Sequence, residues 1–140
     1  MKVLYTAEAI ATGEGRNGHV RSSDGLLDAD VAMPAEMGGK GGATNPEQLF
    51  AAGYAACFHS ALRLVAKSAK ADVTGSTVTA KVGIGPNETG GFGLTAELAV
   101  ALPNVPHAEA EKLVEQAHQV CPYSNATRGN IDVALSVVGA

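Results

Sequence analysis

The segment 45–69 constrains the fold more than any other, because a helix start is followed by a long stretch without a further proline. Asn45 is a good N-cap residue, Pro46 suits the first helical position, and Glu47 complements the dipole of the first turn. Thr44 with Glu47 could instead form a capping box. The segment therefore predicts a long helix around which the rest of the chain must pack.

Most side chains along this helix are small and apolar. They recur at three- and four-residue steps and define one predicted buried face, formed by Leu49, Ala52, Gly53, Ala56, Cys57, Ser60, Ala61 and Leu64. The centre of the helix is apolar nearly all round. We therefore expect a buried central helix.

Segments on both sides of this helix alternate between apolar and polar residues, as half-buried strands do. The predicted strands cover residues 2–12, 19–23, 26–33, 76–85, 92–102 and 131–138. Asn17-Gly18 is the strongest short hairpin signal between the first two strands. It leaves Arg16 at a glycine-flanked tip.

A second helix is predicted from Pro106 to about Val120, and a short helical turn follows Pro122. Its buried side is predicted to hold Ala110, Leu113, Val114 and Ala117. His107 and His118 are expected on its solvated side. The order is three strands, a helix, two strands, a helix and a strand, which indicates an α+β fold rather than alternating βαβ units.

The chain has 140 residues, of which 46% are apolar and 17% charged, so a single domain over residues 1–140 can bury a core. A formal net charge of −4 argues against a nucleic-acid-binding surface. The N-terminus lacks the apolar core of a signal peptide, and we expect no segment long enough to cross a bilayer. We therefore expect a soluble, cytoplasmic protein without nucleic-acid or membrane partners.

Cys57 lies in the middle of the first predicted helix. Burial raises a thiol pKa, and the helix dipole cannot help because Cys57 is about three turns from the N-terminus. A reactive Cys57 therefore needs a cation from another part of the fold. Arg16 is suitable because it is always charged and donates in a fork, and Glu47 could hold it by a bidentate bond.

Cys121 ends the second predicted helix and precedes Pro122. A cysteine at the start of a helical turn gains thiolate character. A disulfide with Cys57 requires Cα atoms within about 7 Å, and packing of the two helices would bring the cysteines near each other. From the residues alone, two inert packing cysteines remain an alternative.

Two segments resemble signature segments of the Ohr/OsmC family: residues 45–62, NPEQLFAAGYAACFHSAL, and residues 121–133, CPYSNATRGNIDV. The tyrosine in GYAACF and the run CPYSNATRGN are more similar to the organic hydroperoxide resistance (Ohr) subgroup than to the OsmC subgroup. The resemblance covers essentially the whole chain. It implies an Ohr/OsmC-like fold with antiparallel strands around two main helices, and an intertwined homodimer.

The same resemblance implies a thiol-dependent peroxidase that reduces organic hydroperoxides to alcohols. Cys57 corresponds to the peroxidatic cysteine, Cys121 to the resolving cysteine, Arg16 to the activating arginine, and Glu47 to the carboxylate that orients it. The cycle passes through a Cys57 sulfenic acid and a Cys57–Cys121 disulfide. It uses no bound cofactor, and a dithiol, expected to be the dihydrolipoyl group of a lipoylated protein, reduces the disulfide.

Apolar side chains near Cys57 would favour alkyl or lipid hydroperoxides over hydrogen peroxide. The candidates are Phe50, Tyr54, Phe58 and Tyr123, for each of which core packing is the alternative. Glu47 and Cys57 are ten residues apart, or roughly 15 Å along one helix. Because no Glu side chain spans that distance, we expect Arg16 or Glu47 to reach Cys57 from the second subunit.

Three other functions remain as alternatives. A non-catalytic carrier of small apolar ligands would use the same pocket without turnover, and an OsmC-type peroxidase would differ in subgroup. A metal site could use Cys57 with His59, or His118 with Cys121. Residues two apart on a helix face different ways, and the second pair lacks two further ligands. We therefore expect no bound metal.

Overall fold

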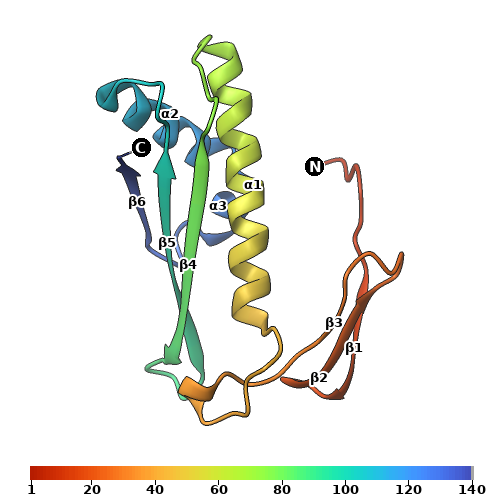
Figure 1. Ribbon diagram of the computed structural model, residues 1–140. Coiled ribbons are helices and arrows are strands. Elements are labelled where there is room, and N and C mark those ends of the chain that lie inside the picture. Colours follow the sequence, from red (N-terminus) through yellow and green to blue (C-terminus); the bar gives the residue numbers. More distant parts are fainter. Residues whose placement is uncertain (140) are drawn as a thin grey trace. The chain divides into compact units, whose positions relative to one another are not determined.

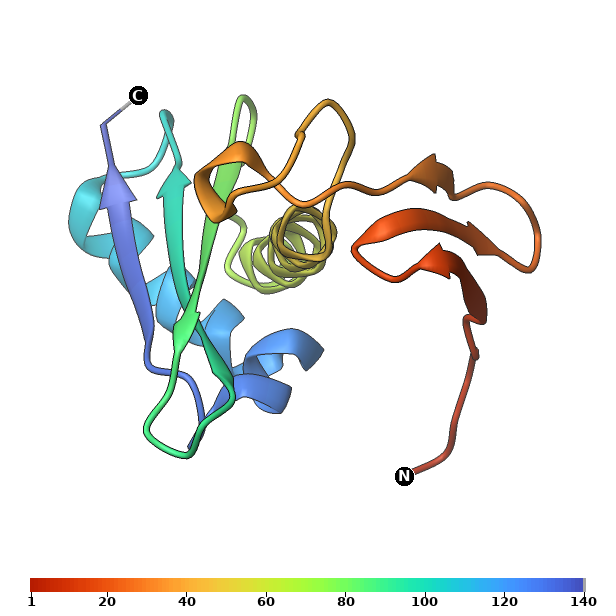
Figure 2. The same cartoon turned by 90° about the horizontal axis from the view of Figure 1, so that it is seen from below.

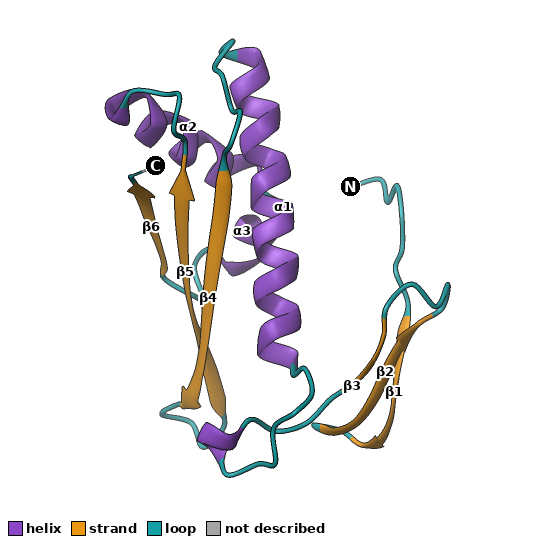
Figure 3. Ribbon diagram, in the orientation of Figure 1, coloured by secondary structure: helices purple, strands orange, loops and turns teal. Residues whose placement is uncertain are grey.

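The computed structural model describes residues 1–139, which divide into two compact units after Leu49 (Figure 1). The first unit carries the N-terminal strands. The second carries most of the long helix, another sheet and two shorter helices (Figure 3). Strands and helices do not alternate as βαβ repeats, so the predicted α+β class is confirmed.

The first unit is built on an antiparallel sheet in the order β1-β2-β3. Its strands are β1 (Ala9–Glu14), β2 (Asn17–Ser22) and β3 (Asp28–Asp30), followed by the 3-10 helix η1 (Ala35–Met37). No residue of these strands is buried in the described chain. The sheet is therefore not stabilised by an apolar core of its own.

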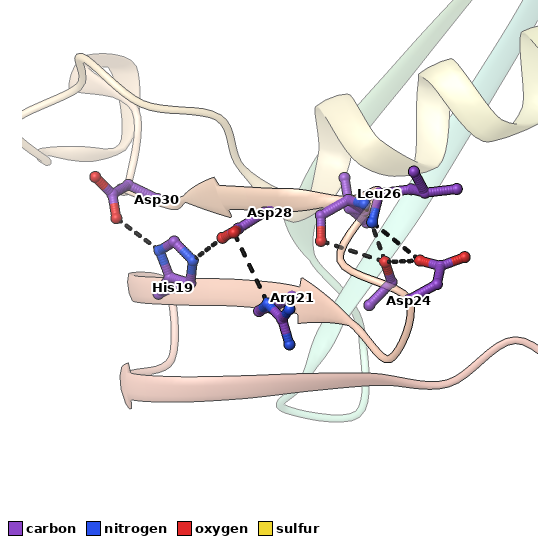
Figure 4. A network of polar contacts seen from close by, with 8 residues as sticks. His19, Arg21, Asp24, Leu26, Asp28 and Asp30 are labelled. Carbon is purple, nitrogen blue, oxygen red and sulfur yellow. Dashed lines mark hydrogen bonds and ion pairs between the residues drawn. The ribbon is translucent and has the colours of Figure 1, made fainter.

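Polar side chains link β2 to β3 on the surface (Figure 4). The His19 ring lies between two carboxylates, with Nδ1 2.8 Å from Asp30 and Nε2 in contact with Asp28. Arg21 lies 3.8 Å from Asp28, and Asp24 accepts two hydrogen bonds in the turn that follows β2. These exposed links hold the short strand β3 in register.

The β1–β2 hairpin turns at Gly15 and Arg16, not at Asn17-Gly18 as predicted. Gly15 has a φ of +66°, a conformation that glycine adopts without strain. Gly18 is the second residue of β2 and is required for another reason: a Cβ there would clash with the carbonyl oxygen of Thr12. The prediction that Arg16 lies at the hairpin tip is confirmed.

Two predicted strands are shorter in the structure. The predicted strand 2–12 begins only at Ala9, because β2 ends at Ser22 opposite this residue, and only the Ser23 N–H reaches further, to the Glu8 carbonyl. The predicted strand 26–33 is reduced to β3, and Val31 forms a bridge with Thr44 instead. Alternation identifies strand-compatible segments, but the partner strand sets their length.

The second unit contains a sheet in the order β4-β5-β6. β4 (Thr77–Pro86) and β5 (Phe92–Ala101) are antiparallel, whereas β6 (Val133–Val138) runs parallel to β5. The expectation of antiparallel strands is therefore wrong for the last strand. α2 (His107–Val120) and α3 (Pro122–Thr127) lie between β5 and β6, and such a crossover allows neighbouring strands to run parallel.

The core of the second unit lies between one face of this sheet and the helices, as the view along α1 (Pro46–Ser68) illustrates (Figure 2). Alternate residues of β5 are buried there: Ala96, Leu98 and Val100. The predicted buried side of α2 is confirmed: Ala110, Leu113, Val114 and Ala117. His107 is exposed as predicted, but His118 is half-buried because it bonds to α3.

The predicted start of α1 is confirmed. The Gln48 backbone N–H donates to Asn45 Oδ1 at 2.8 Å, as expected of an N-cap. The alternative capping box is not formed, because Thr44 Oγ1 bonds the Gln48 side chain and the Glu47 carboxylate pairs with Arg16. Glu47 is thereby left free of a capping role.

The predicted buried face of α1 is confirmed at Ala61 but wrong for half of its residues. The buried residues are Tyr54, Phe58, Ala61, Leu62 and Ala66. Of the predicted face, Ala52, Ala56 and Ser60 are exposed and Leu64 is 59% exposed. On a helix that is apolar nearly all round, residue spacing does not decide which side meets the core, and here the large aromatic rings do so.

The expectation that no segment is long enough to cross a bilayer is also wrong. An 18-residue window of α1 has a mean hydropathy of 1.4, although only 28% of that window is buried. The core helices of soluble proteins meet the same criterion of length and composition. Unlike such core helices, which are mostly buried, α1 leaves most of its apolar window exposed within the described chain.

Candidate active site

The two thiols lie side by side in the second unit, with Cys57 Sγ and Cys121 Sγ 3.5 Å apart. Cys57 is half-buried on α1, whereas Cys121 is fully buried between α2 and α3, and neither is in a disulfide. A disulfide requires about 2.05 Å between the sulfurs, so a small approach would close it. The expected proximity of the cysteines is confirmed.

Cys121 occupies the junction of α2 and α3. Its backbone N–H donates to the Ala117 carbonyl at 2.8 Å and ends α2, and its extended ψ of 122° redirects the chain into α3. Pro122 at the first position of α3 costs no helical hydrogen bond. The sequence Cys-Pro therefore creates the corner that turns the buried thiol toward α1.

Burial raises the pKa of the Cys57 thiol, and neighbouring Cys121 raises it further. The backbone N–H of Tyr123, in the first turn of α3, lowers the pKa but does not overcome the effect of burial. Within the described part of the second unit, no cationic side chain contributes to this pKa. A thiolate at neutral pH therefore requires a positive charge from elsewhere.

The first unit contains an arginine paired with a carboxylate. Arg16 donates two hydrogen bonds to Glu47, from Nη1 to Oε2 at 2.8 Å and from Nη2 to Oε1 at 2.7 Å. This pairing raises the pKa of Arg16 and lowers the pKa of Glu47, so both groups are charged at neutral pH. The predicted bidentate bond is present, and the Arg16 side chain keeps 32% of its surface exposed.

Aromatic rings pack beside the thiols. The ring of Tyr123 lies 6.0 Å from that of Phe50 and 5.7 Å from that of Tyr54, in tilted arrangements. Tyr54 and Phe58 are fully buried, whereas Tyr123 is 40% exposed and Phe50 is half-buried. Phe50 and Tyr123 are thus the two predicted pocket residues with surface available to a ligand, and the substrate role of all four stays a prediction.

Gly53 is a residue whose role the sequence did not indicate. A Cβ at this position would lie 3.0 Å from the Tyr123 hydroxyl and 3.3 Å from its ring. The missing side chain on α1 therefore makes room for the ring of Tyr123. A glycine inside a helix is unfavourable, and such a position is the signal that could have pointed to a close contact.

A chain of buried hydroxyls was also missed. Ser124 Oγ lies 2.8 Å from the Tyr54 hydroxyl and 2.8 Å from His118 Nδ1. The Tyr54 hydroxyl lies 3.4 Å from Thr127 Oγ1, which itself donates to the Ser124 carbonyl. Ser124 and Thr127 are buried on α3, and polar residues spaced three apart after Cys121 were the available signal.

The two histidines of the metal alternative have other partners. His59 Nε2 bonds Ser76 Oγ at 2.9 Å, and His118 Nδ1 bonds Ser124. Among the described residues, no group of three His, Cys, Asp or Glu side chains could hold a metal ion. Within the described chain, the two cysteines therefore have no third metal ligand of the His, Cys, Asp or Glu type beside them.

Residues 39–136 match the family model described as OsmC-like protein. The chain is 57% identical over 138 residues to the organic hydroperoxide resistance protein of Xanthomonas axonopodis pv. citri, covering 97% of this chain and 96% of that protein. It is 48% identical to the organic hydroperoxide resistance protein OhrB of Bacillus subtilis, covering 96% and 98%.

Solved structures agree with these sequence relatives. The organic hydroperoxide resistance protein of Elizabethkingia anophelis superimposes with a TM-score of 0.95 at 60% identity, covering all of both chains. An OsmC-like protein of Mycoplasma pneumoniae, 16% identical, shares the fold with a TM-score of 0.76 over 100% of this chain and 99% of that chain. This chain therefore belongs to the organic hydroperoxide resistance group of the OsmC-like family.

Proposed function

We propose that this protein protects against organic hydroperoxides as a thiol peroxidase. The observation that carries the proposal is the pair of free thiols 3.5 Å apart, one half-exposed and one buried, in a chain of the organic hydroperoxide resistance group. Two inert core cysteines have no reason to place their sulfurs within one small movement of a disulfide. The arrangement suits a nucleophile and a resolving partner.

In the first step, the Cys57 thiolate attacks the terminal oxygen of the hydroperoxide. A sulfur–oxygen bond forms, the oxygen–oxygen bond breaks, and the alkoxide takes a proton to leave as an alcohol. Cys57 becomes a sulfenic acid. The Arg16 guanidinium, held by Glu47, would stabilise both the thiolate and the charge that develops on the oxygens.

In the second step, Cys121 attacks the sulfenic sulfur of Cys57. The disulfide forms and the sulfenic hydroxyl leaves as water with the proton of Cys121. A dithiol must then reduce the disulfide by exchange, and we propose a dihydrolipoyl group on a lipoylated protein. No bound cofactor takes part in this cycle.

We propose that the Arg16–Glu47 pair serves Cys57 of a second copy in a homodimer. Glu47 lies in the first turn of α1 and Cys57 ten residues further along the same helix, or about 15 Å. The exposed small and apolar residues of α1 offer a surface for the second copy: Ala52, Ala56, Ser60 and Leu64. Burial of that surface would also account for so apolar a helix in a soluble, cytoplasmic protein.

A subunit-mixing experiment tests this arrangement. Alone, Cys57→Ser chains are expected to be inactive and Arg16→Ala chains to keep about a hundredth of wild-type activity. Unfolding and refolding them together produces mixed dimers, in which one site combines an intact Cys57 with the intact Arg16 of the other chain. Recovery of about a quarter of wild-type activity is expected from random exchange. No recovery, or a fully active monomer, would contradict the shared site.

The aromatic cluster suggests the substrate class. Phe50 and Tyr123 are the exposed or half-exposed rings near Cys57, and Phe50 packs edge-on against Tyr123. Such a surface would favour the alkyl chain of an organic hydroperoxide over hydrogen peroxide. Cumene hydroperoxide and hydrogen peroxide, compared by kcat/KM, test this preference.

The central experiment maps the thiols after one turnover. Reduced protein receives one equivalent of cumene hydroperoxide, and mass spectrometry then locates the modified cysteines. A Cys57–Cys121 disulfide within one chain, with release of the alcohol, is expected. Two unmodified thiols would contradict the peroxidase and leave a non-catalytic carrier as the better explanation. Cys57→Ser is the matched control, since a carrier would still bind its ligand.

A further inference from the structure

We propose that Tyr54, Ser124 and His118 are positioning residues that hold Cys121 ready to close the disulfide. The inference rests on the proposed peroxidase cycle and concerns its second step. The three side chains are joined through Ser124 Oγ by two hydrogen bonds of 2.8 Å each. None of them contacts the reacting oxygen in the proposed mechanism.

The chain of hydrogen bonds connects the three helices that carry the thiols. Tyr54 lies on α1 one turn before Cys57, and His118 lies in the last turn of α2, just before Cys121. Ser124 lies on α3 one turn after Cys121. A single buried hydroxyl therefore links points within about one helical turn of each sulfur.

The hydroxyls of Tyr54 and Ser124 contribute hydrogen bonds rather than merely filling space in the core. Tyr54 and Ser124 have no exposed surface, and a buried hydroxyl is tolerated only where it has partners. Phe at position 54 and Ala at position 124 would fill the same space without that requirement. The hydrogen bonds therefore add something that apolar packing alone would not, namely a defined position of α3 relative to α1.

The donor and acceptor of each hydrogen bond in this network can be assigned. Thr127 Oγ1 donates to the Ser124 carbonyl, so toward Tyr54 it acts only as an acceptor. Burial and the nearby Arg128 lower the pKa of His118, while Glu115 opposes them. A neutral His118 accepts from Ser124 at Nδ1, which leaves Ser124 free to accept from Tyr54. Every hydroxyl hydrogen then has an acceptor at hydrogen-bond distance.

Position matters for the second step because the two sulfurs must approach from 3.5 Å to about 2.05 Å. Intramolecular reactions depend steeply on such geometry. A sulfenic acid that waits for its partner can be oxidised further by peroxide. Loosening α3 should therefore slow disulfide formation and increase over-oxidation, while affecting the attack of Cys57 on peroxide much less.

The test measures the two steps separately in Ser124→Ala and His118→Leu. Quenched-flow measurement of alcohol release reports the first step, and alkylation with mass spectrometry reports disulfide formation. We expect alcohol release within about twofold of wild type and disulfide formation slowed about ten- to a hundredfold. His118→Asn, which keeps a hydrogen-bonding atom near the Nδ1 position, should restore the closure rate.

Ser76→Ala is the matched control, because it removes another serine–histidine bond to α1, at His59. It should leave disulfide formation unchanged. Unchanged disulfide formation in both Ser124→Ala and His118→Leu, or an equal loss in Ser76→Ala, would overturn the proposal. So would a proportional loss of both steps, since that indicates general destabilisation.

A peroxide-free measurement separates this inference from the proposed function. The equilibrium of the Cys57–Cys121 disulfide in glutathione redox buffers reports how well the thiols are positioned. Tyr54→Phe should form the disulfide less readily than wild type by a similar factor, and an unchanged equilibrium would overturn the inference. If wild type formed the disulfide in these buffers but never released an alcohol, the peroxidase would fail while the positioning role stood.

Discussion

The two units stabilise their functional groups by opposite means. The thiol pair is set inside the core of the second unit, where Leu98 and Leu62 have no exposed surface. The Arg16–Glu47 pair stands at a hairpin tip and a helix start, in a unit whose strands bury no residue in the described chain. The thiol pair has a fixed geometry, but burial raises the pKa of Cys57. The ion pair keeps its charge near the surface, on strands that have no apolar core of their own.

This difference suits the separate roles that we propose for the thiol pair and for the Arg16–Glu47 pair. A guanidinium inside the core would need its own compensation, and thiols on an exposed hairpin would lose their alignment. Separating the two pairs lets each have the environment that suits it. In the proposed mechanism, catalysis depends on the two pairs meeting, so that assembly of the proposed homodimer would have a chemical role as well as a structural one.

The largest expected effect comes from the thiols themselves. Cys57→Ser should abolish peroxide reduction completely, because the attacking atom is lost. Cys121→Ser should consume about one equivalent of hydroperoxide per site and then stall or over-oxidise, because the sulfenic acid has no partner. Peroxide consumption with a dithiol present measures both. Sustained turnover by Cys121→Ser would remove its resolving role.

The second effect concerns the ion pair. Arg16→Ala should slow the peroxide step at neutral pH by about 10²-fold, the loss typical of removing one donor to a developing charge. Glu47→Gln should slow it less, because the amide still offers an oxygen to Arg16. The pH dependence of Cys57 alkylation measures the thiol pKa in each variant. A Cys57 pKa unaltered by Arg16→Ala would be incompatible with the activating role.

The third prediction compares the stability of the two units. Leu98→Ala, in the core on β5, should lower the free energy of unfolding by about 2–5 kcal/mol. Ile10→Ala, on β1, removes a side chain that is 62% exposed in the chain and should cost much less. Urea unfolding of both variants provides the comparison. Equal losses would mean that β1 is buried in the assembled protein, and the contrast between the units would then belong to the isolated chain alone.

The sequence predicted the helices and strands better than their placement. The N-cap at Asn45 and the buried side of α2 follow from local chemistry, and both are confirmed. The buried side of α1 could not be predicted, because a helix apolar all round has no preferred phase. The direction of β6 depends on the crossover, which no local pattern in residues 133–138 records.

The site shows the same limit. Arg16 and Glu47 could be paired in advance, because their chemistry is complementary and the hairpin tip was recognisable. The hydroxyl bond between Tyr54 and Ser124 could not, since the two residues are separated by 70 positions and each is ordinary where it stands. This hydrogen bond depends on how α3 packs against α1, which no local sequence pattern reveals.

The smallest expected effect tests the polar support of the first unit. His19 is bonded to Asp30 and Asp28, and these bonds raise its pKa above the ordinary 6.5. A raised pKa means that the protonated ring stabilises the folded hairpin below pH 6.5, and that this contribution is lost as the pH rises through the folded pKa. Because the ring is exposed, the effect should be small and salt-sensitive. Urea midpoints of wild type and His19→Gln should differ more at pH 5.5 than at pH 8.5, whereas a difference independent of pH would assign β3 a support other than this ion pair.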